Sequence, residues 1–385
     1  MQSSLSGLAL LLSALLTSCS VGNRGRSECA TPLTYVTNKH TSGEQALKGA
    51  ALYVGELPVG SSDTAILAII DTASANLVVN EKSFDFGDDT VTGRRDFIFD
   101  NGHAQSVTKN AKDDLDIACV ADFPVRFSLT AKERPTPNYL GLAFKDSKRH
   151  PHEAKSVSFF DQLVRREDFD NVFSLALCGV RGNSRVVLGG IDDRMISLVG
   201  HFIPMMEKTA YVVPAVSLRR GDTKKVLGEF PLYDTRNQSG TRTIIDSTSA
   251  FLMLPSAMAT ALASEIESVA NGIGLLPLLP PGFFRTERFN AVRVAQFHNL
   301  AQLRQFPPIE ITFIGADGKI KALEISPLRY LKEMDNTDPM QRTFAVREAT
   351  EDIILGQPFL ESHYMFFDRK NGRIGFANID IACAD

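Results

Sequence analysis

Short apolar runs separated by polar turn residues follow one another along most of the chain. Three of them, Ala65–Ile70, Val186–Leu188 and Ile309–Ile314, are rich in β-branched or long aliphatic residues. Clusters of Gly, Asp and Asn separate such runs, as in the segment Asp368–Gly372. Apolar runs of this length, bounded by turn residues, predict β-strands. We therefore expect an all-β architecture with short helices.

Helical periodicity is confined to a few places. Phe159–Arg166 has apolar residues at helical spacing, and Ser256–Ala270 begins directly after Pro255 and ends before Gly272. A proline before such a run and a glycine after it are start and stop signals of a helix. Residues 272–308, with their Leu-Leu-Pro-Leu-Leu-Pro-Pro-Gly run, are expected to form a long loop or insertion.

The start of the chain carries a different pattern. Residues 5–19 form an apolar run that is too short to span a bilayer and ends in small residues, which is typical of a secretory signal. We expect residues 1–19 to be a signal peptide, residues 20–49 to contain the first strand, and the protein to be secreted or held in the secretory pathway. The run also matches the lipid-attachment box of bacterial lipoproteins. A lipid anchor at Cys19 is therefore the alternative for a bacterial source. No later segment resembles a membrane span.

A seven-residue pattern occurs twice and is the most informative feature of the chain. Ala68–Ser74 and Thr243–Ser249 each contain an apolar strand pair, an aspartate, a hydroxyl residue, one further residue and a serine. Each copy is followed later by an apolar pair and a glycine, in Tyr139–Gly141 and Ile354–Gly356. A lone aspartate after a strand is usually a turn residue. Two aspartates in matched sequence contexts predict two similar structural units.

We expect these units to be an N-terminal lobe at residues 50–172 and a C-terminal lobe at residues 173–385. A pseudo-twofold axis would relate them, with Asp71 and Asp246 meeting across a cleft between the lobes. Two carboxylates held close cannot both ionise cheaply, so they share one proton. The ionised member can accept a proton from water while the protonated member donates to a carbonyl oxygen. The pair therefore favours hydrolysis by an activated water.

The hydroxyl residues of the repeat can support this pair. We expect Thr72 and Ser247, directly after the aspartates, to brace the two loops against each other. Ser74 and Ser249, three residues after the aspartates, are expected to hydrogen-bond the outer carboxylate oxygens and fix their orientation.

Composition and charge remove several other function classes. The chain is 44% hydrophobic and 22% charged with a net charge of −4, so neither disorder nor nucleic-acid binding is expected. It contains no His-Glu-x-x-His, Gly-x-Ser-x-Gly or phosphate-binding glycine loop. His150 and His152 lie in a Lys/Arg-rich segment and are interpreted as an exposed loop rather than a metal site. We expect no metal and no cofactor.

The chain resembles the pepsin-like aspartic peptidases over about residues 50–380. Six stretches carry the resemblance, in the order typical of that family: Ile70–Val79, Val172–Leu175, Val187–Asp192, Ile353–Leu360, Tyr364–Asp368 and Arg373–Ala377. The resemblance implies a bilobal acid-protease fold. It also implies a monomeric endopeptidase that binds a protein or peptide substrate in the interlobe cleft.

The resemblance also has departures. Ala73 and Thr248 stand where the family usually has glycine, and Phe99 takes the place of the flap tyrosine. The tryptophan that usually partners that tyrosine falls at Val78, and the chain has no Trp. By the same alignment Phe99, Gly102, Ala73 and Thr248 are expected to contact substrate. These departures keep a second hypothesis open, a catalytically impaired peptide-binding or inhibitory protein. Both aspartates and all four supporting hydroxyls are present, which favours the peptidase.

The cysteines and one sequon fit an exported chain. Cys29, Cys119, Cys178 and Cys383 would remain after removal of a signal, and four cysteines allow two disulfides in three connectivities. The resemblance places Cys29 and Cys383 in terminal segments near the central sheet of the fold. Asn237 begins an Asn-x-Ser glycosylation sequon.

Overall fold

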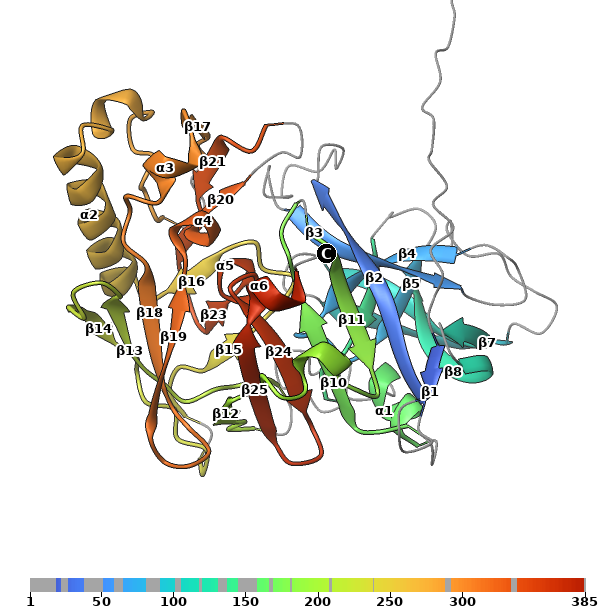
Figure 1. Cartoon of the computed structure of the whole chain (residues 1–385). Coiled ribbons are helices and arrows are strands. Elements are labelled where there is room, and N and C mark those ends of the chain that lie inside the picture. Colours follow the sequence, from blue (N-terminus) through green and yellow to red (C-terminus); the bar gives the residue numbers. More distant parts are fainter. Residues whose placement is uncertain are drawn as a thin grey trace, which may run out of the picture.

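The computed structural model presents the protein as two β-rich halves that lie side by side (Figure 1). The described residues are 19–21, 27–37, 51–58, 65–80, 91–100, 105–117, 120–130, 137–144, 158–165, 169–180, 182–207, 210–237, 239–287, 292–333 and 338–383. The predicted signal peptide therefore lies outside them, except for Cys19. The pair His150 and His152 lies outside them entirely.

The largest sheet of the described chain has fourteen strands and runs through both halves. Its order is β12 (His201–Pro204), β25 (Arg373–Asn378), β24 (His363–Asp368), β10 (Val172–Ala176), β11 (Ser184–Leu188), β2 (Ser27–Thr37), β3 (Ala51–Pro58), β4 (Ala65–Asp71), β9 (Asn138–Gly141), β5 (Leu77–Asn80), β8 (Val120–Thr130), β7 (Gln105–Ile117) and β6 (Val91–Asp100). The short strand β1 (Cys19–Val21) pairs with β2 beside this path. The first and last strands of the described residues thus belong to one sheet. The expected boundary between residues 172 and 173 falls inside β10.

In the described part of the chain, three smaller sheets belong to the C-terminal half. The first follows the order β14 (Val226–Glu229), β13 (Ala215–Arg220), β18 (Ile309–Ile314) and β19 (Ile320–Ile325). The second is β15 (Thr243–Ile245), β23 (Ile353–Leu355), β16 (Leu252–Leu254) and β22 (Val346–Glu348). The third is β17 (Ala295–Gln296), β21 (Gln341–Phe344) and β20 (Leu331–Glu333). The prediction of a mainly β fold is confirmed.

The sequence repeat corresponds to a repeat of strand arrangement. β4 pairs in parallel with β9, β9 pairs antiparallel with β5, and β5 pairs in parallel with β8. In the second half β15, β23, β16 and β22 are joined by the same three kinds of pairing in the same order. Each aspartate loop is therefore the connection between the first and third strands of an equivalent four-strand unit.

Among the described residues, the helices are short except for one. They are α1 (Phe159–Val164), α2 (Ser256–Gly272), α3 (Leu300–Leu303), α4 (Pro327–Tyr330), α5 (Gln357–Leu360) and α6 (Ile379–Ala382), with 3-10 turns η2 (Asp193–Met195) and η3 (Leu276–Leu278). The α2 helix begins after Pro255, as predicted, and buries Met258, Leu262, Ile266 and Ala270. Because these positions are four residues apart, they form one apolar stripe that packs on the core.

The segment 272–308 is more ordered than the predicted long loop. It contains η3, β17 and α3, and the aromatic residues Phe283, Phe284, Phe297 and Phe306 are buried within it. The rings of Phe283 and Phe284 lie 5.0 Å apart edge-on, and the other two rings continue the cluster. Burial of these rings is a large apolar contribution that fixes a segment with little regular structure.

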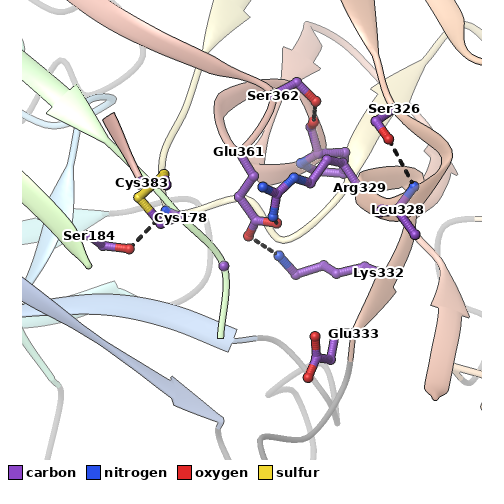
Figure 2. A network of polar contacts seen from close by, with 12 residues as sticks. Cys178, Ser184, Ser326, Leu328, Arg329, Lys332, Glu333, Glu361, Ser362 and Cys383 are labelled. Carbon is purple, nitrogen blue, oxygen red and sulfur yellow. Dashed lines mark hydrogen bonds and ion pairs between the residues drawn. A yellow bond between two sulfur atoms is a disulfide. The ribbon is translucent and has the colours of Figure 1, made fainter. Parts of the chain in front are cut away.

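A buried polar network joins β3 to the C-terminal half. Figure 2 shows three members of the network, Glu361, Lys332 and Arg329. Glu361, at the end of α5, pairs with Lys332 of β20 and accepts a hydrogen bond of 2.8 Å from the Tyr53 hydroxyl of β3. The Arg329 guanidinium lies 3.9 Å from the same carboxylate. Burial lowers the pKa of Lys332 below its usual 10.5, and the Glu361 carboxylate opposes this shift. Removal of one partner from such a pair leaves an uncompensated buried charge.

A disulfide lies beside this polar network. Cys178 is bonded to Cys383 across a sequence separation of 205 residues, and the N–H of the neighbouring Gly179 donates to the Tyr53 hydroxyl at 3.0 Å. The bond fastens the end of the chain to the segment between β10 and β11. Cys119 lies outside the described residues, and for Cys29 only the backbone, paired with Cys19, is described.

Candidate active site

The first aspartate loop joins β4 to β5. Asp71 is the last residue of β4 and is 2% exposed. The N–H groups of Ala73 and Ser74 donate to its Oδ1 at 2.8 and 3.1 Å, and the Ser74 hydroxyl donates to Oδ2 at 2.6 Å. Residues of the same loop thus hold both carboxylate oxygens. Ala73 in place of glycine leaves the N–H at that position directed at the carboxylate.

The second loop holds its aspartate differently. Asp246 follows β15 and is 3% exposed. Thr248 donates to Asp246 Oδ1 twice, from its N–H at 2.9 Å and from its hydroxyl at 2.6 Å. The Ser249 hydroxyl, which was expected to hold the carboxylate, donates instead to the Phe251 carbonyl at 3.0 Å. The hydroxyl that reaches the Asp246 carboxylate is thus that of Thr248, one residue earlier than expected, and it reaches Oδ1.

The two loops are fastened to each other by a reciprocal set of hydrogen bonds. The Thr72 hydroxyl donates to the Ile245 carbonyl at 3.1 Å, and the Ser247 hydroxyl donates to the Ile70 carbonyl at 2.6 Å. The Thr72 N–H donates to the Ser247 oxygen at 3.1 Å, and the Ser247 N–H donates to the Thr72 oxygen at 2.9 Å. Each hydroxyl therefore both donates to and accepts from the opposite loop. This is the geometry of the expected brace.

A glycine packs against each loop from the neighbouring strand end. A Cβ on Gly141 would lie 2.5 Å from the backbone N of Asn76, and one on Gly356 would lie 2.2 Å from the Phe251 carbonyl oxygen. Only a residue without a side chain permits these backbone approaches. The glycine that ends each copy of the sequence repeat is thus explained by contact with its own aspartate loop.

Two residues that the sequence analysis did not single out also support the loops. The carbonyl of Tyr211 accepts from the Ile245 N–H at 3.1 Å, while its hydroxyl donates to the Leu142 carbonyl at 2.5 Å. Burial raises the pKa of Tyr211, so the phenol remains a proton donor. The Gln357 side chain donates to the Ser247 carbonyl at 3.3 Å. In the sequence, only the position of Gln357 directly after Gly356 could have indicated this supporting role.

The residues expected to contact substrate are described in part. Phe99 lies on β6, where its backbone pairs with Ser106 of β7, so it belongs to an antiparallel hairpin. Its side chain and all of Gly102 lie outside the described residues. Val78, at the position where the family usually has tryptophan, is fully buried.

The site consists of two buried carboxylates on loops that are fastened to each other. Asp71 and Asp246 are buried at the ends of equivalent strands, and the brace fixes the loops on which they lie. Within the described part of the chain, no group of three or more His, Cys, Asp or Glu side chains is arranged to hold a metal ion.

Comparison with known proteins decides the family. A family model described as eukaryotic aspartyl protease matches residues 114–379, which is more than half of the chain. The chain belongs to the eukaryotic aspartyl protease family. The sequence-based resemblance to pepsin-like aspartic peptidases is thereby confirmed. The matched region contains Asp246 but begins after Asp71, so the description of the first loop depends on the structure alone.

A curated relative extends this result. The beta-secretase of Strongylocentrotus purpuratus is 23% identical over 261 residues, which cover 62% of this chain and 46% of that protein. The chain thus spans about half the length of this relative. A eukaryotic family gives no support to a bacterial lipid anchor at Cys19. None of the described helices is both long and apolar enough to cross a membrane.

Proposed function

We propose that this chain is an endopeptidase that hydrolyses peptide bonds with a water activated by Asp71 and Asp246. The reciprocal brace of Thr72 and Ser247 is the observation that carries the proposal. Because the brace links the residues that directly follow the two aspartates, it holds their loops at one fixed separation. A protease function, with peptide as the substrate, is what the family supports.

The mechanism follows from a shared proton. One carboxylate of the pair is ionised and accepts a proton from water, while the other is protonated and donates to the peptide carbonyl oxygen. This division of roles is the one known for aspartic proteases in general. The donors from Ala73, Ser74 and Thr248 orient the two carboxylates for these roles. In this proposal Phe99 and Gly102 belong to the hairpin that covers the substrate.

The second candidate is an impaired peptide-binding or inhibitory protein. The replacements Ala73 and Thr248 and the absence of Trp favour it. Against it, both replaced positions still direct their N–H groups at a carboxylate, at 2.8 and 2.9 Å. The lost glycines have therefore not opened the site, and hydrolysis remains the better supported function.

The setting of the enzyme is part of the proposal. The disulfide between Cys178 and Cys383 persists in an oxidising compartment, which supports secretion or residence in the secretory pathway. Residues 1–19 would serve as the signal. Asn237 is exposed, as a glycosylated residue must be. We propose that the enzyme acts as a monomer without metal or cofactor.

The test is the loss of hydrolysis in single variants. Asp71→Asn and Asp246→Asn are each expected to lower kcat at least about a thousandfold, because either change removes one partner of the acid–base pair. Cleavage of a denatured protein and of a quenched peptide library, from pH 3 to pH 7, gives the measurement. Asp317→Asn, at an exposed carboxylate between β18 and β19, is the matched control. Hydrolysis that persists in either folded dyad variant would exclude this mechanism.

A further inference from the structure

The two loops take their hydroxyl donor from different positions. At Asp71 the hydroxyl comes from Ser74, three residues after the aspartate, and reaches Oδ2 at 2.6 Å. At Asp246 it comes from Thr248, two residues after the aspartate, and reaches Oδ1 at 2.6 Å. The first loop cannot copy the second, because the residue matching Thr248 is Ala73 and has no hydroxyl.

Ser249, the counterpart of Ser74, is committed to another task. Its hydroxyl donates to the Phe251 carbonyl, and its own carbonyl accepts from the Gln357 N–H at 2.8 Å. The close approach of Gly356 to the Ser249 carbonyl holds this part of the loop in place. Ser249 thus shapes the turn that leads into β16.

We propose that Thr248 is the positioning residue of Asp246 and that Ser249 has a purely structural role. The inference rests on the proposed function only where it predicts rates, because the geometry applies to the carboxylate whether or not the protein is an enzyme. Thr248 would thus orient Asp246 from a position where the family usually has glycine.

The chemistry of Thr248 suits this task. The N–H and the hydroxyl of Thr248 both donate to Asp246 Oδ1, so one residue holds this oxygen with two hydrogen bonds. The branched Cβ limits the side chain to few rotamers, so little freedom is lost when the hydroxyl is aimed. A hydroxyl that donates to a carboxylate stabilises its ionised form. Loss of the hydroxyl should therefore raise the pH at which Asp246 gains its proton and weaken catalysis without weakening substrate binding.

The experiment compares Thr248→Val, Thr248→Ala, Thr248→Ser and Ser249→Ala in the full chain. Carboxyl signals of ¹³C-labelled aspartate are followed by NMR from pH 2 to pH 8, and Asp246→Asn assigns the signal of Asp246. Thr248→Val and Thr248→Ala should raise the Asp246 titration midpoint by about one pH unit. Thr248→Ser should restore it, and Ser249→Ala should leave it in place. In steady-state assays the first two should lower kcat about tenfold or more with KM nearly unchanged.

The outcomes separate the inference from the proposed function. If Ser249→Ala moves the Asp246 midpoint and the folded Thr248→Ala does not, Thr248 is not the positioning residue. If the wild type cleaves no peptide but the midpoint shifts as expected, the positioning role stands and the peptidase proposal fails. If the wild type cleaves and neither Thr248→Val nor Thr248→Ala changes midpoint or kcat, the inference fails alone. Thr248→Ala keeps the test decisive should the valine variant not fold.

Discussion

The two aspartate loops share a backbone framework and differ in their side-chain anchors. Both connect matching strands, both meet a glycine from the neighbouring strand end, and both enter the same brace. Yet Ser74 and Ala73 hold both oxygens of Asp71, whereas Thr248 grips one oxygen of Asp246. The comparison teaches that strand pairing and close backbone packing fix where the carboxylates lie. The residue whose hydroxyl orients each carboxylate can differ between the two loops.

The largest effect is expected from breaking the shared backbone framework. Gly141→Ala and Gly356→Ala would each drive a Cβ against backbone atoms at 2.5 Å or less, and backbone cannot move aside as a flexible side chain can. We expect each to lower the free energy of unfolding by about 4 kcal/mol. Urea unfolding measures the loss.

The chain offers a matched control for this pair. A Cβ on Gly272, at the end of α2, would meet nothing within 4 Å. Gly272→Ala should therefore change the free energy of unfolding by less than about 1 kcal/mol. If Gly356→Ala were as harmless as this control while Gly141→Ala was not, the two frameworks would not be equivalent.

A smaller effect is expected in the pH dependence of stability, through one buried histidine of the C-terminal half. His363 of β24 is buried between Phe359 and Phe376, and burial lowers its pKa from 6.5 to about 4. Between these values the unfolded chain binds more protons, so stability falls as the pH drops from 6.5 to 4. The shift corresponds to about 3 kcal/mol. A carboxylate dyad that needs acid would thus work in a protein that acid weakens.

Thermal unfolding between pH 7 and pH 4 tests this. His363→Asn keeps a donor for the Phe359 carbonyl but does not titrate, so its stability should depend less on pH than that of the wild type. His298→Gln, at an exposed histidine, should leave the wild-type dependence intact. An unchanged pH dependence in His363→Asn would show that other groups cause the acid sensitivity.

The smallest effect should come from the brace, and it should be symmetric. Thr72→Val and Ser247→Ala each remove one hydroxyl that both donates to and accepts from the opposite loop. Each should cost about 2 kcal/mol of unfolding free energy, with Thr72→Ser close to wild type. Chemical denaturation of the four proteins gives the comparison. A large difference between the two losses would mean that one loop carries the brace alone.

The parts of the site that depend on repetition could be predicted from the sequence. Asp71 and Asp246 stand in matched contexts, and the hydroxyls of Thr72 and Ser247 follow them directly, so pairing of the loops implies the brace. The strand content and the start of α2 followed from apolar runs and from Pro255. These features are local or repeated, and a single sequence displays both.

The rest depends on contacts between distant segments. Ser249 turns its hydroxyl away because the Phe251 carbonyl lies within reach, which only the folded turn reveals. The pairing of Cys178 with Cys383 was one of several that the spacing allowed. Tyr53 meets Glu361 across most of the chain length, and no sequence pattern relates them.

The position of β2 has a consequence for how the protein is made. This strand pairs with β3, which follows it closely, but its other edge pairs with β11, where Thr31 meets Val186. During synthesis β2 emerges before β11, so the edge of β2 that pairs with β11 stays unpaired until the whole of the N-terminal half has emerged. An open edge is a template for pairing with other chains. Nascent copies of this protein are therefore most prone to aggregate in that interval, and folding helpers in the cell should matter most there.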